Sequence, residues 1–227
     1  MKKFVFLSIF ICLSATFCFA QKIVRIEKPD EKPTDSNSFS PEISDKEWQF
    51  INDAMRSEDW ENSALIASRL IERTKAENEK KQLAQLRYFY LYSLAGKVIA
   101  FSEAKKFAEE ETARNELNKA AENFIGKEII MPPRQLLADC SRVLNYICTV
   151  KGNANALRVT ATNKEGTAIH SFENVLFDQK IDLKEFIGKE TFLGGTLAKV
   201  EFNESKSNLW IVRLSFVKGF VRIVVDK

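Results

Sequence analysis

Residues 186–202 read F-I-G-K-E-T-F-L-G-G-T-L-A-K-V-E-F, and this stretch predicts the fold of the C-terminal part of the chain. After a turn at Gly188, β-prone residues form a long run that is broken by the pair Gly194–Gly195. Two glycines inside such a run indicate a bulge or a sharp coil, where a strand bends to follow a curved sheet. The first five residues also occur at 124–128, again where a helix-like segment gives way to a strand-like one. We therefore place the start of a C-terminal β domain near Gly126.

The composition is typical of a folded protein. The chain has 227 residues, of which 45% are hydrophobic and 29% charged, so it can bury a core and global disorder is not expected. Its formal net charge is +3, but Lys2 and Lys3 lie in a predicted leader, and without them 32 Lys and Arg face 31 Asp and Glu. This balance gives no basis for predicting nucleic-acid or anionic-membrane binding.

The first 20 residues have the pattern of a signal peptide. Lys2 and Lys3 precede an apolar run from Phe4 to Phe17, and Cys18 and Ala20 place small residues before a cleavage site. The run is shorter than the roughly 20 residues of a membrane-spanning helix, although a retained anchor is the alternative. A lipoprotein is disfavoured because a large residue precedes each cysteine of the leader. We expect export to a bacterial periplasm or exterior, with no membrane span in the mature protein.

Two cysteines, Cys140 and Cys148, remain after cleavage. An even pair in an oxidising compartment predicts a disulfide, and the short loop places its stabilisation at the low end of the roughly 2–4 kcal/mol range. Two buried free thiols are the alternative. No metal site or cofactor is expected, because two cysteines and the single His170 fall short of the four ligands of a structural zinc site.

Residues 21–43 are polar and rich in proline and serine, which predicts a linker. Helices are then expected over 44–125. Ser44 and Glu47 form a capping box, the acidic cluster at 57–59 suits the start of a second helix, and Gly96 is expected to end a third. A fourth helix is expected from about Ser102 to Asn123.

These helices resemble the helical hairpins of tetratricopeptide repeats. The resemblance rests on Trp60 through Ile71 and Leu86 through Ala95, and on helix starts near Lys46 and Lys80 that are 34 residues apart. Because such repeats need about three copies to be stable alone, the helices are expected to pack against the β domain.

Regularly spaced turns over 126–227 predict six or seven strands in a small closed or nearly closed β barrel. The segment 134–145 fits either a short helix or the approach to a strand, a short helix is expected at 178–186, and Lys218–Gly219 is expected to be a turn. The fold class is thus α+β. The glycine-broken strand resembles the first strand of OB-fold barrels, which implies binding of an oligonucleotide or oligosaccharide on a barrel face.

Motifs of common hydrolases and cofactor enzymes are missing from the sequence: G-x-S-x-G, H-E-x-x-H, the phosphate loop and G-x-G-x-x-G. His170 fits a general base or, alternatively, a partly exposed strand residue. A Cys148–His170 nucleophile pair lacks an orienting group. The carboxylate pairs Glu201–Glu204 and Asp178–Asp182 lie in polar segments, where solvated surface is the simpler interpretation.

The C-terminal part from Gly126 carries 15 Lys and Arg against 11 Asp and Glu. If its arginines share a face with aromatic side chains, that face suits an extended anionic ligand; an ordinary basic outer face is the alternative. The candidate ligand-binding residues are Arg158, His170, Trp210, Arg213 and Arg222.

Three functions follow from these observations. The first is a non-enzymatic interaction or scaffold protein of the bacterial envelope that binds another envelope protein through its helices or its barrel. The second is a barrel that binds a glycan or another anionic polymer, with nucleic acid disfavoured by export. The third is a small hydrolase that uses His170.

Overall fold

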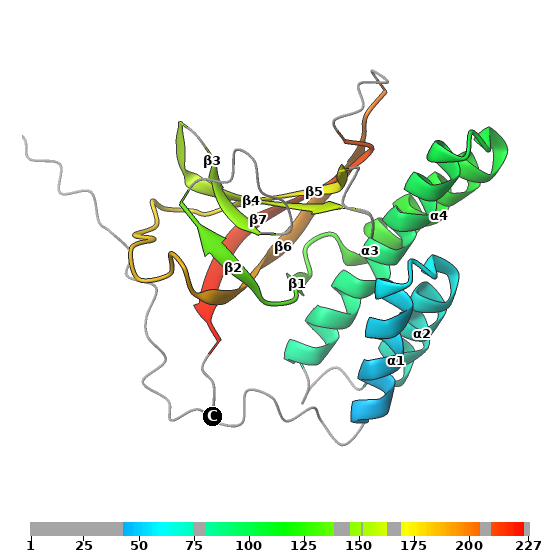
Figure 1. Cartoon of the computed structure of the whole chain (residues 1–227), viewed down its shortest axis with the longest axis horizontal. Helices are drawn as coiled ribbons and strands as arrows, with labels where there is room; N and C mark the ends of the chain where they lie inside the picture. Colours follow the sequence, from blue (N-terminus) through cyan, green and yellow to red (C-terminus); the bar gives the residue numbers. More distant parts are fainter. Residues whose placement is uncertain are drawn as a thin grey trace, which may run out of the picture.

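A computed structural model describes residues 43–74, 80–138, 146–150, 152–162, 169–204 and 210–224. In these residues four helices precede seven strands. The helices are α1 (Asp45–Arg56), α2 (Trp60–Arg73), α3 (Lys80–Glu103) and α4 (Phe107–Phe124). The strands are β1 (Glu128–Ile130), β2 (Arg134–Leu137), β3 (Ile147–Val150), β4 (Asn153–Thr162), β5 (Ile169–Leu176), β6 (Glu190–Phe202) and β7 (Val212–Ile223). The helices gather on one side of the sheet (Figure 1).

The predicted starts of the first two helices are confirmed. The Ser44 hydroxyl oxygen accepts a hydrogen bond from the Glu47 backbone N–H at 3.4 Å, and the Ser44 backbone N–H donates to the Glu47 carboxylate at 2.9 Å. The capping box at the start of α1 is therefore complete. Asp59 caps α2 by accepting a hydrogen bond from the Asn62 backbone N–H at 3.3 Å.

The predicted end of the third helix at Gly96 is wrong, because α3 continues to Glu103. Gly96 lies under the ring of Trp60, and a Cβ at this position would overlap that ring. The glycine therefore lets α2 and α3 approach closely, and its conformational freedom is not used to stop the helix. The fourth helix starts at Phe107, five residues later than expected.

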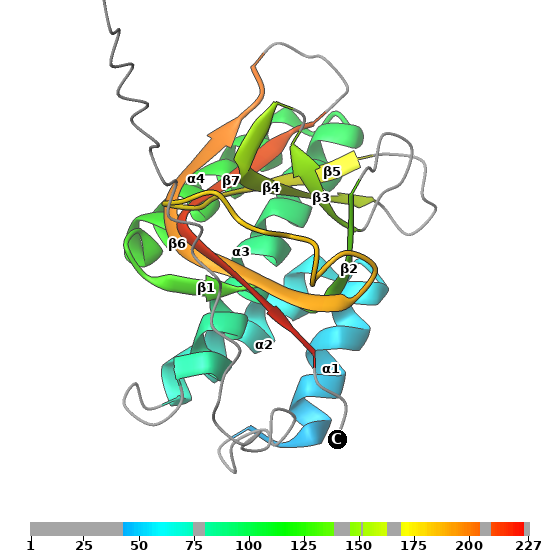
Figure 2. The ribbon, with the colours of Figure 1, turned by 90° about the vertical axis from the view of Figure 1, so that its left-hand side faces the viewer.

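The seven strands form one mixed sheet in the order β1-β6-β2-β3-β4-β5-β7, and pairing of β6 with β7 closes it into a ring (Figure 2). The β2–β3 and β5–β7 pairs are parallel, and the other pairs are antiparallel. The fold is therefore α+β, as predicted.

The glycine pair in β6 lies at a register shift against β7, between Gly194 and Thr196, which confirms the predicted irregularity. An added Cβ at Gly194 would lie 2.7 Å from the Ile129 carbonyl oxygen, and one at Gly195 would lie 2.8 Å from the Val217 carbonyl oxygen. The two glycines thus let β1 and β7 approach the bend of β6 from opposite edges.

The structure resolves one open alternative of the sequence analysis and corrects two of its expectations. Residues Arg134–Leu137 form strand β2, which pairs with β6 and β3, so the helical alternative is wrong there. Residues 178–186 contain turns and a bridge residue at Ile181 instead of a helix. Lys218 has a left-handed φ of 51°, yet β7 continues through it without a chain reversal.

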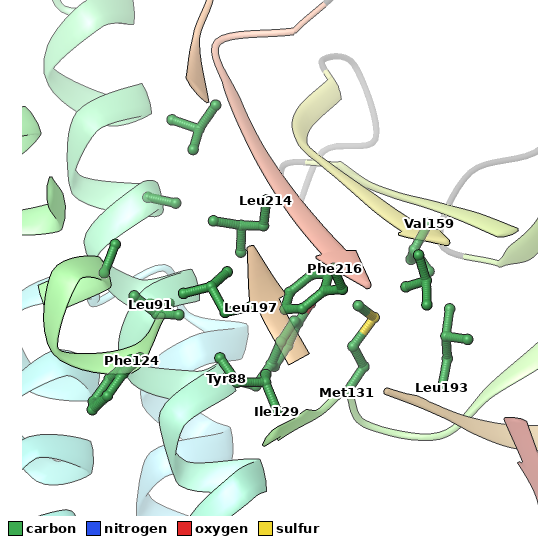
Figure 3. Packing of buried hydrophobic residues seen from close by; sticks show 14 of the residues in the cluster. Tyr88, Leu91, Phe124, Ile129, Met131, Val159, Leu193, Leu197, Leu214 and Phe216 are labelled. Atoms are coloured by element: carbon green, nitrogen blue, oxygen red, sulfur yellow. The ribbon is translucent and has the colours of Figure 1, made fainter. Parts of the chain in front are cut away.

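One hydrophobic core extends from α3 and α4 into the ring (Figure 3). Tyr88, Leu91 and Phe124 contribute from the helices, and Leu197 and Phe216 from the strands. A second cluster lies among the first three helices: Ile43, Trp48, Ile51, Ala67, Leu70, Leu86 and Phe89. The helices thus pack against the β part, as expected, while the domain boundaries themselves stay predictions. Within the described residues, no helix has the length and apolar character needed to cross a membrane.

Candidate functional site

The outer face of the ring carries two of the predicted ligand-binding residues, Arg158 and Arg213, with one strand between them. Arg158 of β4 is level with Asn174 of β5, which is level with Ser215 of β7. Arg213 lies two residues before Ser215 on the same face, since the alternate residues of both strands are buried in the core. Arg158 and Arg213 are therefore two strands and two residues apart, which is about 12 Å by the usual strand spacing and rise.

Trp210 joins this pair, but Arg222 does not. The Arg213 guanidinium lies over the Trp210 ring at 4.1 Å from its centroid. Arg222 stacks on Phe220, with its guanidinium 4.7 Å from the ring centroid. It lies nine residues after Arg213 along β7, which is roughly 30 Å at the usual rise of a strand. The five candidates are thus not brought together in one place.

One carboxylate, that of Glu201, offsets part of the positive charge of this face. Glu201 accepts a hydrogen bond from Lys199 at 2.9 Å and is level with Arg213. The Lys199 hydrogen bond, with a contribution from the Arg213 charge, lowers the pKa of Glu201. A face with this internal neutralisation attracts a polyanion less strongly than its arginine content suggests.

The other chemical candidates are structurally separate. The backbone of His170 lies in β5, but its side chain is outside the described part. Cys148 is disulfide-bonded and has no thiolate to use as a nucleophile, whereas Cys140 lies outside the described residues, so the predicted pairing stays a prediction. Glu204 binds Arg114 at 2.8 Å, and Asp178 and Asp182 are exposed.

A buried polar cluster that the sequence reasoning missed joins α3 to the ring. Glu173 of β5 is fully buried, and the Tyr88 hydroxyl donates to its Oε1 at 3.1 Å. Burial, followed by the Glu173 charge, raises the pKa of Tyr88 well above its usual value. Burial alone would lower the pKa of Arg134, but Tyr88 and Glu173 outweigh it and raise that pKa. The signal in the sequence was a glutamate two residues before Val175, hence on the inward face of its strand.

A hollow with a volume of about 740 Å³ lies between α1 and α2. We call this surface the α1–α2 groove; its lining residues are Glu47, Phe50, Asp53, Ala54, Ser57, Asp59, Asn62, Ile66, Arg69, Leu70 and Arg73. They recur at intervals of three and four, so each helix presents one stripe to the groove. Phe50 stands in it with 63% of its surface exposed.

A bidentate ion pair ties the two helices together at one end of the groove. The Arg73 guanidinium donates to both carboxylate oxygens of Glu47, at 2.7 and 2.9 Å. The hydrogen bond from Arg73 is the main reason why the pKa of Glu47 falls from 4.5 to about 2. A smaller hollow of about 280 Å³ lies between α2, α3 and α4, where Lys97 binds Glu116 at 2.7 Å.

The described residues contain no group of three or more His, Cys, Asp or Glu side chains placed to hold a metal ion. Comparisons with protein-family models, with curated proteins and with solved structures found no match to this chain.

Proposed function

We propose that the protein is an exported, non-enzymatic interaction protein of the bacterial envelope, which binds a protein partner through the α1–α2 groove. The observation that carries the proposal is an open hollow with an exposed phenylalanine among its lining residues. The predicted leader supports export, and the missing catalytic motifs support a binding role.

The chemistry of the groove suits a protein surface. Its apolar lining residues are Phe50, Ala54, Ile66 and the buried Leu70, and its charged ones are Glu47, Asp53, Asp59, Arg69 and Arg73. Aromatic and arginine side chains are both enriched at protein interfaces, and the groove presents both kinds. Covering Phe50 alone removes an aromatic surface from water, which contributes about 1.5–3 kcal/mol when burial is complete.

Site-specific photo-crosslinking in the producing cells tests this proposal. A photoreactive phenylalanine analogue at position 50 should give a discrete protein adduct. The matched control is position 107, because Phe107 is 74% exposed but lies at the start of α4, outside the groove. The proposal fails if position 50 gives no adduct or only the adducts that position 107 gives.

A second candidate function is binding of an acidic glycan or another anionic polymer on the outer face of the ring. The stacking of Arg213 on Trp210, with Arg158 two strands away, favours it. Cation and aromatic side chains together are how OB-like barrels hold extended polymers, and the closed ring with its bent β6 supports that resemblance.

Retention on a resin that carries an acidic polysaccharide tests the second candidate. The double variant Arg158→Ala/Arg213→Ala should elute at lower salt than the wild type, and Arg222→Ala should elute with the wild type because it lies at the far end of β7. Equal elution of all three proteins would exclude this face as the site.

A further inference from the structure

The charges of the α1–α2 groove differ in sign between its two helices. On α1 the charged lining residues are Glu47 and Asp53, both acidic. On the C-terminal half of α2 they are Arg69 and Arg73, both basic. Asp59 is the remaining charged lining residue and caps α2. The groove therefore has an acidic wall and a basic wall, which lie side by side and antiparallel.

The Glu47–Arg73 ion pair fixes which residues of the two helices are level. Counting from it along the antiparallel helices places Phe50 level with Leu70, and Ala54 level with Ile66. Asp53 then lies within about 3 Å of the level of Arg69, because each residue rises about 1.5 Å along a helix. An acidic residue on one wall thus has a basic residue at nearly the same level on the other.

A two-fold axis that runs along the groove, parallel to the helices, exchanges the walls between two copies. It places α1 of one copy on α2 of the other. Because the axis is parallel to the helices, each residue keeps its position along them. Asp53 then faces Arg69 of the second copy, and Phe50 lies one helical turn from the level of Ile66, the half-buried apolar residue that α2 presents to the groove. Because the operation is symmetric, each contact forms twice, as in other isologous interfaces.

Resting on the proposed function of the groove, we propose that its partner is a second copy of this chain, docked about this two-fold axis. The four helices of the pair would alternate in direction, which is the arrangement of antiparallel bundles. Both exposed Phe50 rings would become buried. At each of the two contacts, Asp53 of one copy would meet the opposite charge of Arg69 of the other.

The size of the surface predicts a weak, reversible pair. With α2 as the longer helix at 14 residues, the groove face is about 20 Å by about 20 Å, or about 400 Å² per copy. Two such faces bury less than the roughly 1,200–2,000 Å² of standard stable interfaces. We therefore expect dimerisation in the micromolar range or weaker, supported by local concentration in the envelope.

Sedimentation of the full mature chain over a range of micromolar concentrations tests the proposal by charge exchange. Asp53→Arg alone and Arg69→Asp alone each set like charges against each other twice, so each variant should dimerise at least about five-fold more weakly than the wild type. An equimolar mixture of the two variants restores unlike charges at both contacts and should dimerise like the wild type. The double variant in one chain should do the same.

Controls separate this surface from other effects. Arg222→Asp changes an exposed charge on the ring and Phe107→Ala removes an exposed ring from α4, and neither should change the dimerisation constant. Phe50→Ala should weaken it. Because all these side chains are exposed, circular dichroism of each variant should match the wild type.

The possible outcomes are distinct. Weakening by both single variants with recovery in their mixture supports the two-fold pair. A dimer that ignores the charge exchange and Phe50→Ala uses another surface, which overturns the proposal. A protein that stays monomeric while position 50 crosslinks to a chain of different mass also overturns it but leaves the proposed function standing. A monomer without any crosslink at position 50 overturns both.

Discussion

Gly96 shows how one missing side chain determines the packing of two helices. The residue lies in the interior of α3, where glycine costs about 1 kcal/mol relative to alanine. The position tolerates this cost because the Trp60 ring occupies the space of a Cβ. Trp60 itself is 8% exposed, so the contact belongs to the buried interface between α2 and α3.

Gly96→Ala should therefore destabilise the protein by about 1–3 kcal/mol, the usual cost of overpacking, although helix propensity alone predicts a gain. The free energy of unfolding in urea measures the effect. In a Trp60→Leu background the loss on Gly96→Ala should shrink, because the ring that causes the overlap is gone. A stabilised Gly96→Ala protein would show that the two helices can separate at no cost.

The charge of Glu173 is one of the causes that raise the pKa of Arg134, so we expect the guanidinium to compensate this buried carboxylate where α3 meets the ring. Arg134→Met should destabilise the protein by about 3–5 kcal/mol, because it leaves Glu173 buried without a cation. Tyr88→Phe removes the 3.1 Å hydrogen bond to Glu173 and the hydrogen bond with Arg134, and should cost about 1.5–3 kcal/mol.

Urea unfolding measures both variants, with Arg222→Met as an exposed control on the same sheet. Adding Glu173→Leu to Arg134→Met should recover most of the stability, because a buried ion pair replaced by apolar groups is often neutral. If Arg134→Met unfolds like the control, the guanidinium does not compensate Glu173.

At the scale of elements, local signals predicted the structure well where local chemistry determines it. The capping box of Ser44 and Glu47 places the start of α1, and the Gly194–Gly195 pair places the bend of β6. Residues 134–137 could not be assigned in this way. Leu136 and Leu137 fit a helix or a strand, and only pairing with β3 and β6, from distant parts of the chain, decides for a strand.

The same limit applied to the candidate site. Trp48, Ile51 and Met55 recur at helical spacing, and this stripe packs into the cluster that α1 shares with α2 and α3. The spacing did not predict that Phe50 and Ile66 would share an open surface, because that depends on how α1 and α2 lie against each other. The inward position of Glu173 was readable from strand alternation, but its partners on α3 and β2 were not.

The Glu47–Arg73 ion pair predicts how the α1–α2 hairpin responds to pH. The pKa of Glu47 is about 2 in the folded protein and 4.5 ordinarily, so the folded state favours the charged form. This contribution to stability is fully present above about pH 4.5 and is lost as the pH falls towards 2.

The stability advantage of the wild type over Glu47→Gln should therefore shrink steadily between about pH 5 and pH 2. Urea midpoints over this range measure the difference, in dilute solution so that self-association does not contribute. An advantage that stays constant down to pH 2 would show that the ion pair is absent in solution.

At the scale of the whole molecule, the helices and the ring share one core but present different surfaces. Figure 2 shows the ring in front of the helices, so a partner on the α1–α2 groove leaves the outer face of β4, β5 and β7 accessible. A pair of chains joined through the groove would present two such faces. If the ring binds a polymer, this arrangement would raise its avidity without any new contact.

Hydroxyl-radical footprinting in intact producing cells tests the central claim, that the α1–α2 groove is covered by a protein, most directly. Phe50 and Phe107 are both well exposed in the free chain, at 63% and 74%. We expect Phe50 to be oxidised several-fold more slowly in the cell than in dilute purified protein, while Phe107 reacts at the same rate in both. Equal oxidation of Phe50 in both conditions would contradict the account, because the groove would then be open where the protein works.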